Sequence, residues 1–281
     1  MKNLFKTTVL LAGIGGLLIV LGGLFGGRTG MFIGLALGLV IVGVSYWNSD
    51  KLAIRAARAV PVTEQEMPEY HAIVRELAQK ADMPMPKLYL SPEMQPNAFA
   101  TGRNPEHAAV AVTRGILEVL TWDELRGVLA HELGHVRNRD ILISSVAAAV
   151  AMGITVLANM AQWAAIFGGG RGDDDEGANP LALLAMAIFA PLAAGLLQAA
   201  LSRTREYEAD QTGKELIGDG RPLASALAKI EQYAKQVPMN VDPAHAQAFI
   251  VNPLTGRRMQ FATLFRTHPP TEDRIARLLD Q

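Results

Sequence analysis

The stretch Ala130-His131-Glu132-Leu133-Gly134-His135 contains the pattern H-E-x-x-H. On an α-helix, residues four apart lie on one face, so His131 and His135 can direct two imidazoles at one zinc ion. Glu132 lies next to the first histidine and can reach a water molecule bound to that ion. The stretch therefore predicts a helix that carries two zinc ligands and a general base.

The residues around the pattern also favour a helix. Thr121 and Glu124 have the spacing of a capping box, in which two side chains satisfy free backbone amides at a helix start. Apolar residues then recur at helical spacing at Leu125, Val128, Leu129 and Leu133. Gly134 costs roughly 1 kcal/mol of helix stability relative to Ala, which indicates that another segment packs closely there. Two unrelated surface histidines are the alternative, but a chance match is rare because only 6 of the 281 residues are histidine.

The composition limits the classes of protein and of metal site. Half of the residues are apolar, 19% are charged, and the mean hydropathy of +0.18 is high for a soluble globule. The formal net charge of −1 gives no electrostatic case for binding nucleic acid. The chain has no cysteine, which excludes disulfides and thiolate ligands. Zinc must therefore be bound by His, Asp or Glu, and the candidate imidazoles are His71, His107, His131, His135, His245 and His268.

Four apolar runs have lengths close to the roughly 20 residues of a membrane-spanning helix. Residues 7–25 and 31–47 form the first pair, and we expect residues 1–47 to be a transmembrane hairpin. A cleaved signal peptide is the alternative for the first run, but it lacks an A-x-A-like cleavage site. In residues 141–201 we expect two further transmembrane helices, joined by a short acidic loop at 168–179. A pair of buried core helices is the alternative for this second pair.

The basic residues near the ends of these runs predict the orientation in the membrane. In a four-span arrangement, Arg28 and Arg171 lie on one side, and the other basic residues near the span ends lie on the opposite side. Cytoplasmic loops carry the excess of Lys and Arg, so we expect both termini and the metal-binding region to face the cytoplasm. This arrangement also places residues 48–140 and 202–281 on one side, as a metal site shared between them requires.

Residues 48–140 and 202–281 are soluble in character and form the two parts of the expected metal-binding domain. In the first part, the pattern predicts a helix at 61–81, strands at 87–90, 97–102 and 109–113, and then the zinc-binding helix. In the second part, it predicts helices at 202–217, 222–234 and 271–279, the last with Thr271 as its N-cap. The expected fold is therefore a membrane α+β protein, with four transmembrane helices and a mainly helical zincin-type domain that has a small β-sheet.

The best source of a third zinc ligand is the segment 202–210. Glu206 and Asp210 are four residues apart and share a helix face, so one can bind zinc while the other orients a ligand histidine. Glu208 points roughly 200° away from Glu206 and cannot serve the same ion. The side chain of Glu is one methylene longer than that of Asp, which favours Glu206 for direct ligation. A solvated charged helix is the alternative for this segment.

Four groups of residues together resemble HtpX-type membrane zinc metalloproteases, which are relatives of the CAAX prenyl endopeptidases. These groups are H-E-L-G-H at 131–135, S-R-x-R-E-Y-x-A-D at 202–210, Asn97-Ala98-Phe99-Ala100, and Thr267-His268-Pro269-Pro270 with Arg274. The resemblance covers nearly the whole chain, including the leading hairpin and the two later apolar runs. It implies Glu206 as the third zinc ligand and Asp210 as its support.

The resemblance also implies roles for residues outside H-E-x-x-H. His268 and Arg274 are expected near the site, where His268 would steady the oxyanion of the tetrahedral intermediate. Asn97, Ala98, Phe99 and Ala100 are expected to form a substrate-binding edge strand, to which an extended peptide adds by backbone pairing. Without the resemblance, His268 would be an ordinary turn histidine ahead of two prolines.

The implied activity is that of a zinc-dependent integral-membrane endopeptidase, which cleaves misfolded or membrane proteins in quality control at the bacterial cytoplasmic (inner) membrane. Its partners are polypeptide substrates and the lipid bilayer, and its cofactor is one Zn²⁺ per chain. Glu132 takes the proton of the zinc-bound water and passes it to the leaving amine. One alternative is a non-catalytic membrane scaffold that binds zinc structurally, for which Glu132 would have no use. The other is a CAAX-type processing protease, for which the chain has too few spans.

Overall fold

The computed structural model describes residues 16, 19, 27–33, 35, 36, 39, 40, 43, 44, 46–142, 203–236 and 269–280. Most residues of the four expected transmembrane segments lie outside this part of the chain, as do the acidic loop and His268. Within the described residues, no helix combines the length and the apolar character needed to cross a membrane. Of the two parts of the expected metal-binding domain, residues 48–140 are described in full and residues 202–281 at 203–236 and 269–280.

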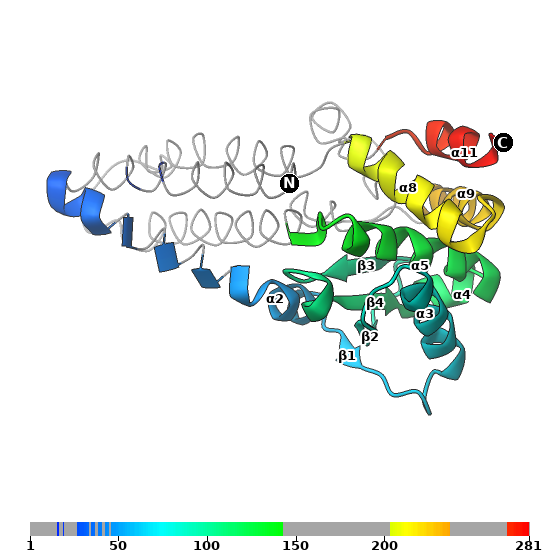
Figure 1. Cartoon of the computed structure of the whole chain (residues 1–281), viewed down its shortest axis with the longest axis horizontal. Helices are drawn as coiled ribbons and strands as arrows, with labels where there is room; N and C mark the ends of the chain where they lie inside the picture. The colour runs from blue at the N-terminus through cyan, green and yellow to red at the C-terminus, as the bar shows by residue number, and fades with distance from the viewer. Residues whose placement is uncertain are drawn as a thin grey trace, which may run out of the picture.

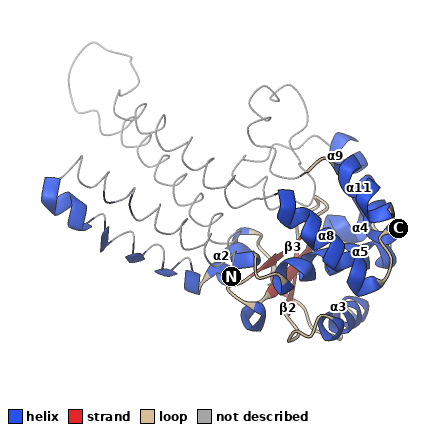
Figure 2. Ribbon diagram, turned by 45° about the horizontal axis from the view of Figure 1, so that its top comes forward, coloured by secondary structure: helices blue, strands red, loops and turns tan. Residues whose placement is uncertain are grey.

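The described part consists of helices around a small sheet (Figure 1). Its first part contains α2 (Ser49–Ala56), β1 (Val60–Pro61), α3 (Pro68–Lys80), β2 (Lys87–Ser91), β3 (Ala98–Thr101), the 3-10 helix η1 (Pro105–His107), β4 (Ala109–Thr113), α4 (Arg114–Val119) and α5 (Trp122–Arg137). Its second part contains α8 (Arg203–Ile217), α9 (Arg221–Gln236) and α11 (Thr271–Leu279). Figure 2 shows most of these helices on one side of the strands and α2 on the other.

The sheet is mixed, with the strand order β1-β2-β4-β3. β2 and β4 are parallel, whereas β1 and β3 are antiparallel to their neighbours. Val110 and Val112 of β4 belong to the main core with α3 and α5, and Ala109 and Ala111 belong to a smaller cluster with Ile54 of α2. Helices therefore cover both faces of β4, which explains why this strand is apolar throughout rather than alternating.

Helix α5 lies at the centre of the domain, between the sheet and the helices of the second part (Figure 1). Two glycines allow α5 and α8 to approach closely. A Cβ atom on Gly134 would lie 3.0 Å from the carbonyl oxygen of Ala209, and one on Gly213 would lie 2.9 Å from the backbone nitrogen of His131. The close packing expected at Gly134 is thus confirmed, and it brings the two helices together beside the histidines.

The capping box of α5 is present, with both Thr121 and Glu124 bonded as predicted. The expected helix at 61–81 is wrong over residues 61–67, about two turns, because the chain there forms β1 and a turn. The backbone amide and hydroxyl of Thr63 donate to Glu66 at 2.7 and 2.8 Å, and this local turn competes with the helix until Pro68.

The expected N-cap of the last helix is also wrong by one residue. Pro270, with φ −53° and ψ 135°, is the N-cap of α11, and Thr271 is the first helical residue. Proline has a fixed φ that suits a helix start, and it takes up the extended conformation of a cap without a side-chain hydrogen bond. The other predicted helices and strands of the described part are confirmed, with ends shifted by a few residues.

Candidate metal centre

Helices α5 and α8 bring three potential metal ligands together. One ligand atom from each of His131, His135 and Glu206 lies within 4.8 Å of the others. The two Nε2 atoms are 3.2 Å apart, and the carboxylate of Glu206 lies 3.5 Å from Nε2 of His135 and 3.9 Å from Nε2 of His131. A tetrahedral zinc ion with bonds of about 2.0–2.1 Å separates its ligand atoms by about 3.3 Å, so this donor set fits zinc.

The ring of His131 is oriented by a buried ion pair from two other helices. Its Nδ1 lies 2.9 Å from Oδ1 of Asp210 on α8. Arg274 of α11 donates to both oxygens of Asp210, from Nε at 2.8 Å and from Nη2 at 2.7 Å, and is only 1% exposed. Burial raises the pKa of Asp210, but Arg274 and His131 outweigh this effect and lower the pKa to about 2. Asp210 is therefore a fixed acceptor for Nδ1 of His131.

The ring of His135 is oriented by Asp140, a residue for which the sequence pattern predicted no role. Both oxygens of Asp140 lie within 3.2 Å of Nδ1 of His135. The end of α5 explains the contact: Arg139 has φ 57°, and the amides of Arg139 and Asp140 donate to the carbonyls of Val136 and His135. These two bonds form a Schellman motif, which turns the chain back so that Asp140 faces His135. In the sequence, this contact is indicated only by an aspartate five residues after the second histidine.

The charges of the site favour a bound cation. Burial lowers the pKa of His135, but Asp140, Glu206 and Glu132 outweigh it and raise the pKa to about 10. The imidazole thus experiences an excess of negative charge. A divalent ion held by His131, His135 and Glu206 would neutralise that excess.

Glu132 lies against β3, which is a free edge of the sheet within the described residues. The amide of Ala100 in β3 donates to Oε2 of Glu132 at 2.9 Å. The amide of Thr113 donates to the carbonyl of Asn97, and antiparallel hydrogen bonding alternates along a strand. The backbone groups of Ala98 and Ala100 therefore point away from β4. A base and an open strand edge are thus adjacent in one site.

The structure brings together most of the residues singled out in the sequence. His131, His135, Glu206, Asp210 and Arg274 form one cluster, buried except for the partly exposed His135, and Glu132 with Ala98 and Ala100 lies beside it. Phe99 instead packs toward α2 on the other face of the sheet. Asn97 is buried, and its carbonyl pairs with β4 rather than with the free edge. His268 lies outside the described residues.

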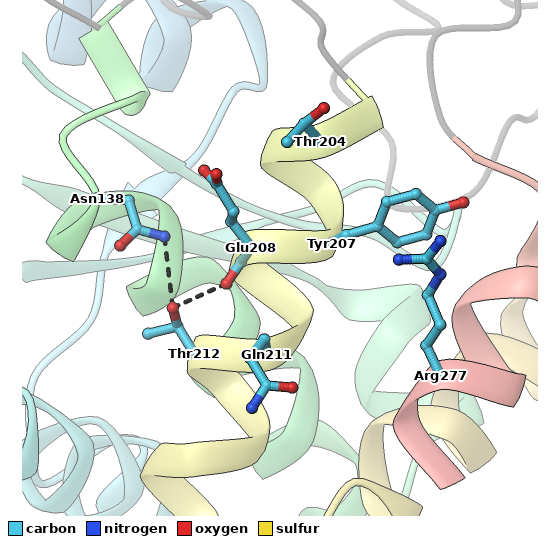
Figure 3. Close-up of a pocket in the computed structure, with 7 residues that line it drawn as sticks. All are labelled: Asn138, Thr204, Tyr207, Glu208, Gln211, Thr212 and Arg277. Carbon is cyan, nitrogen blue, oxygen red and sulfur yellow. Dashed lines mark hydrogen bonds between the residues drawn. The ribbon is translucent and has the colours of Figure 1, made fainter. Parts of the chain in front are cut away.

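The opposite side of α8 carries a separate surface pocket of about 620 Å³. Its lining residues are Asn138, Thr204, Tyr207, Glu208, Gln211, Thr212 and Arg277 (Figure 3). None of these is a member of the metal cluster. The guanidinium of Arg277 lies 3.8 Å from the ring centre of Tyr207, a cation–π contact that joins α11 to α8. This contact helps to hold α11 where Arg274 can reach Asp210.

Two histidines and a glutamate in a helical H-E-x-x-H pattern, with a carboxylate from a second helix as the third ligand, define the metallopeptidase class. The chain belongs to Peptidase family M48, whose family model matches residues 64–281. It is 53% identical over 281 residues to the Protease HtpX homolog of Syntrophobacter fumaroxidans, with 99% of each chain covered. It is 52% identical over 283 residues to the Protease HtpX homolog of Burkholderia mallei, with 100% of this chain and 97% of that one covered.

Among solved structures, the chain is similar to the crystal structure of Ste24p from S. mikatae, with a TM-score of 0.54 and 18% identity. The match covers 99% of this chain but 66% of Ste24p, so the chain spans just under two thirds of that structure's length. At this level of identity the likeness establishes the fold. The resemblance to HtpX-type proteases drawn from the sequence is confirmed by the relatives and the family model.

Proposed function

We propose that this chain is a zinc-dependent endopeptidase of the bacterial cytoplasmic membrane that cleaves misfolded or membrane polypeptides. The observation that carries the proposal is the convergence of His131, His135 and Glu206 beside Glu132 at the free edge of β3. In this assignment the first three residues bind the metal and Glu132 is the general base. A structural metal site needs only its ligands, so a buried glutamate at an open strand edge favours an enzyme over a scaffold.

Lewis acidity toward water and the scissile carbonyl is the chemistry that zinc supplies when bound. Burial raises the pKa of Glu132, although His131 and His135 partly counter this effect. A raised pKa makes the carboxylate a better proton acceptor, so Glu132 takes the proton of the attacking water and passes it to the leaving amine. Asp210 and Asp140 accept from Nδ1 of the two histidines, which keeps each Nε2 directed at the shared site.

The free edge of β3 is the proposed substrate-binding element. An extended peptide adds to the outward backbone groups of Ala98 and to the carbonyl of Ala100, whose amide is bonded to Glu132, and this places its backbone next to Glu132. Pairing through main-chain groups depends little on side-chain identity, which suits an enzyme for misfolded polypeptides. We also propose that His268 stabilises the oxyanion of the tetrahedral intermediate and that Arg274 fixes the position of Asp210.

Contact with lipid is supported by the described helical residues between 27 and 47. Phe32, Leu39 and Val40 expose 69%, 66% and 60% of their surface, which is unusual for apolar side chains of a soluble protein. Tyr46 and Trp47 follow, and such rings are enriched where a helix leaves the membrane. We therefore propose a multi-pass protein with its catalytic domain and both termini on the cytoplasmic side.

The test uses the full chain purified in detergent, with casein as the substrate. The wild type should degrade casein. It should lose this activity after treatment with a chelator and regain it when zinc is added. Glu132→Gln should keep its zinc but lose cleavage, whereas the matched variant Glu118→Gln, which changes an exposed glutamate of α4, should behave as wild type. Cleavage by metal-free wild type would exclude a metallopeptidase. Loss of zinc from Glu132→Gln would show that Glu132 is a ligand rather than the base.

A further inference from the structure

The turn after β3 contacts the end of the helical residues that precede α2. The guanidinium of Arg103 lies 5.3 Å from the ring centre of Trp47, which is a cation–π contact. Nη1 of Arg103 also donates to the backbone carbonyl of Trp47 at 3.4 Å. Arg103 follows the last residue of β3, Thr101, by two positions. The contact therefore joins the proposed substrate-binding strand to the point where the chain leaves the proposed membrane segment.

The turn that carries Arg103 is held by its own contacts. Gly102 has φ 134°, a conformation that favours glycine, and a Cβ atom there would overlap the carbonyl oxygen of His107. The side chain of Asn104 accepts from the amide of His107 at 3.1 Å and caps the 3-10 helix η1. Arg103 thus has a fixed backbone position from which its side chain reaches Trp47.

Helix α2 makes a second link to β3. The amides of Asn48 and Leu52 each donate to the carbonyl four residues earlier, at 3.0 and 2.9 Å, so helical hydrogen bonding continues from the preceding segment into α2. Ile54 of α2 packs in one cluster with Phe99 of β3. The described residues between 27 and 47 lead away from the domain and end at α2, beside the sheet (Figure 1). The strand and the end of the apolar segment are therefore joined at two places.

The surface around Trp47 suits the boundary between lipid and water. Trp47, Lys51 and Arg55 are successive positions four residues apart, so a ring and two cations follow one another on one helix face. All three side chains are exposed, and Trp47 is 65% exposed. An apolar run, then an aromatic ring, then basic residues is the order typical of a helix that leaves the cytoplasmic face of a membrane.

These contacts limit how far the candidate site can lie from that boundary. The amide of Ala100 donates to Glu132 at 2.9 Å, and Ala100 is three residues before Arg103. Three residues span at most about 10 Å, and the Arg103 side chain covers the remaining distance to Trp47, so Glu132 lies on the order of 20 Å from Trp47 or less. An extended peptide covers about 20 Å with about six residues.

We propose that the contact between Arg103 and Trp47 holds the substrate-binding strand at the membrane surface, and that the substrates are extended segments of membrane proteins directly beside their membrane-spanning helices. This proposal rests on the proposed function and names its substrate class. A segment that begins about six residues from the bilayer is long enough to reach β3 and Glu132. Neither a soluble protein nor a long loop is needed to supply it.

The experiment uses the full chain reconstituted in vesicles of phosphatidylethanolamine and phosphatidylglycerol, together with a designed substrate. The substrate has one apolar helix of about 20 residues, a Gly-Ser linker and a casein-derived segment fused to a folded tag. The linker has about six residues in a short version and about 30 in a long version. The wild type should cut both versions within the casein segment, as mass spectrometry of the products would show.

Variants of Arg103 test the role of the contact. Arg103→Ala should cut the short version ~2–5-fold more slowly than wild type, which is the rate equivalent of one exposed cation–π contact. It should cut the long version, and free casein in detergent, at the wild-type rate. Arg103→Lys keeps a cation over the ring and should fall between the two. Arg114→Ala, which changes an exposed arginine of α4, is the matched control and should match wild type.

A wild type that cuts casein in detergent but not the short version would overturn this proposal and leave the proposed function intact. So would Arg103→Ala with unchanged cleavage of the short version, or with an equal loss on all three substrates. A wild type that does not cut casein would instead overturn the proposed function. Circular dichroism checks the fold of each variant, and if Arg103→Ala does not fold, Trp47→Ala decides the question by the same comparison.

Discussion

Replacing Glu124 by Gln should destabilise the protein without changing the shape of the side chain. Glu124 is the third residue of α5, and its carboxylate accepts from the amide of Thr121 at 2.9 Å. It also accepts from the hydroxyl of Ser225 at 2.7 Å and from the ammonium of Lys229 at 2.8 Å. Ser225 and Lys229 belong to α9, so Glu124 joins the start of the H-E-x-x-H helix to the second part of the domain.

The size of the effect follows from the pKa of this carboxyl. Burial raises the pKa of Glu124, but hydrogen bonds from Lys229, Ser225 and Thr121 outweigh it and lower the pKa from 4.5 to about 2. At about 1.36 kcal/mol for each pKa unit, the stabilisation at neutral pH is at most about 3 kcal/mol. Lys229 is 43% exposed and partly screened, so we expect Glu124→Gln to lose about 2 kcal/mol. This corresponds to a decrease in Tm of about 4–8 °C.

The pH dependence tests the electrostatic origin. Because the pKa of Glu124 is lower in the folded state, its stabilisation is complete above about pH 4.5 and is lost as the pH falls toward about 2. Thermal unfolding of the metal-free wild type and Glu124→Gln, followed by tryptophan fluorescence in detergent, gives the Tm difference at each pH. It should be constant from about pH 7 to about pH 5 and shrink below that range. A difference that persists unchanged to about pH 3, or is absent at neutral pH, would refute this reasoning. Glu118→Gln is the control.

Three further predictions concern the metal and the membrane. Glu206→Gln should abolish zinc binding, whereas Glu208→Gln should keep it, as metal analysis of the two proteins would show. Zinc in Glu206→Gln and none in Glu208→Gln would mean that the other face of α8 binds the metal. Asp210→Asn should weaken zinc affinity by roughly 10–100-fold, measured by competition with a chelator, and unchanged affinity would contradict the support that Asp210 gives His131. Cysteines introduced at Gly172 and Gln281 test the topology: an impermeant thiol reagent outside intact cells should label position 172 only, and labelling at 281 would disprove it.

The parts of the fold that the sequence predicted well are those with local causes. The capping box at Thr121 and the apolar spacing after it depend on residues near in sequence, and both are present in α5. The close packing at Gly134 is made with the distant Ala209, but the glycine within a helical pattern was itself a local sign of it. The error at 61–81 arose from two local preferences in competition, in which the hydrogen bonds between Thr63 and Glu66 prevailed over helical spacing.

The contacts that the sequence could not predict depend on geometry between distant segments. Asp140 faces His135 only because Arg139 adopts a left-handed conformation, which is unusual for a residue other than glycine. The bond between Ala100 and Glu132 depends on the register of β3 against β4, and no local pattern specifies that register. Spacing identified Arg205 only as part of a charged helix, and its burial without a hydrogen-bond partner among the described residues becomes visible only in the fold.

The position of the metal ligands on two separate helices has a consequence for folding. His135 and Glu206 are about 70 residues apart in sequence, so an ion bound by both closes a loop of that length. By the relation used for disulfides, such a closure removes unfolded-state entropy worth about 4 kcal/mol. In a chain without cysteine, an ion bound there would thus be a removable cross-link as well as a cofactor. We expect the protein to open more readily when zinc is scarce, and so to become a substrate for proteases in its turn.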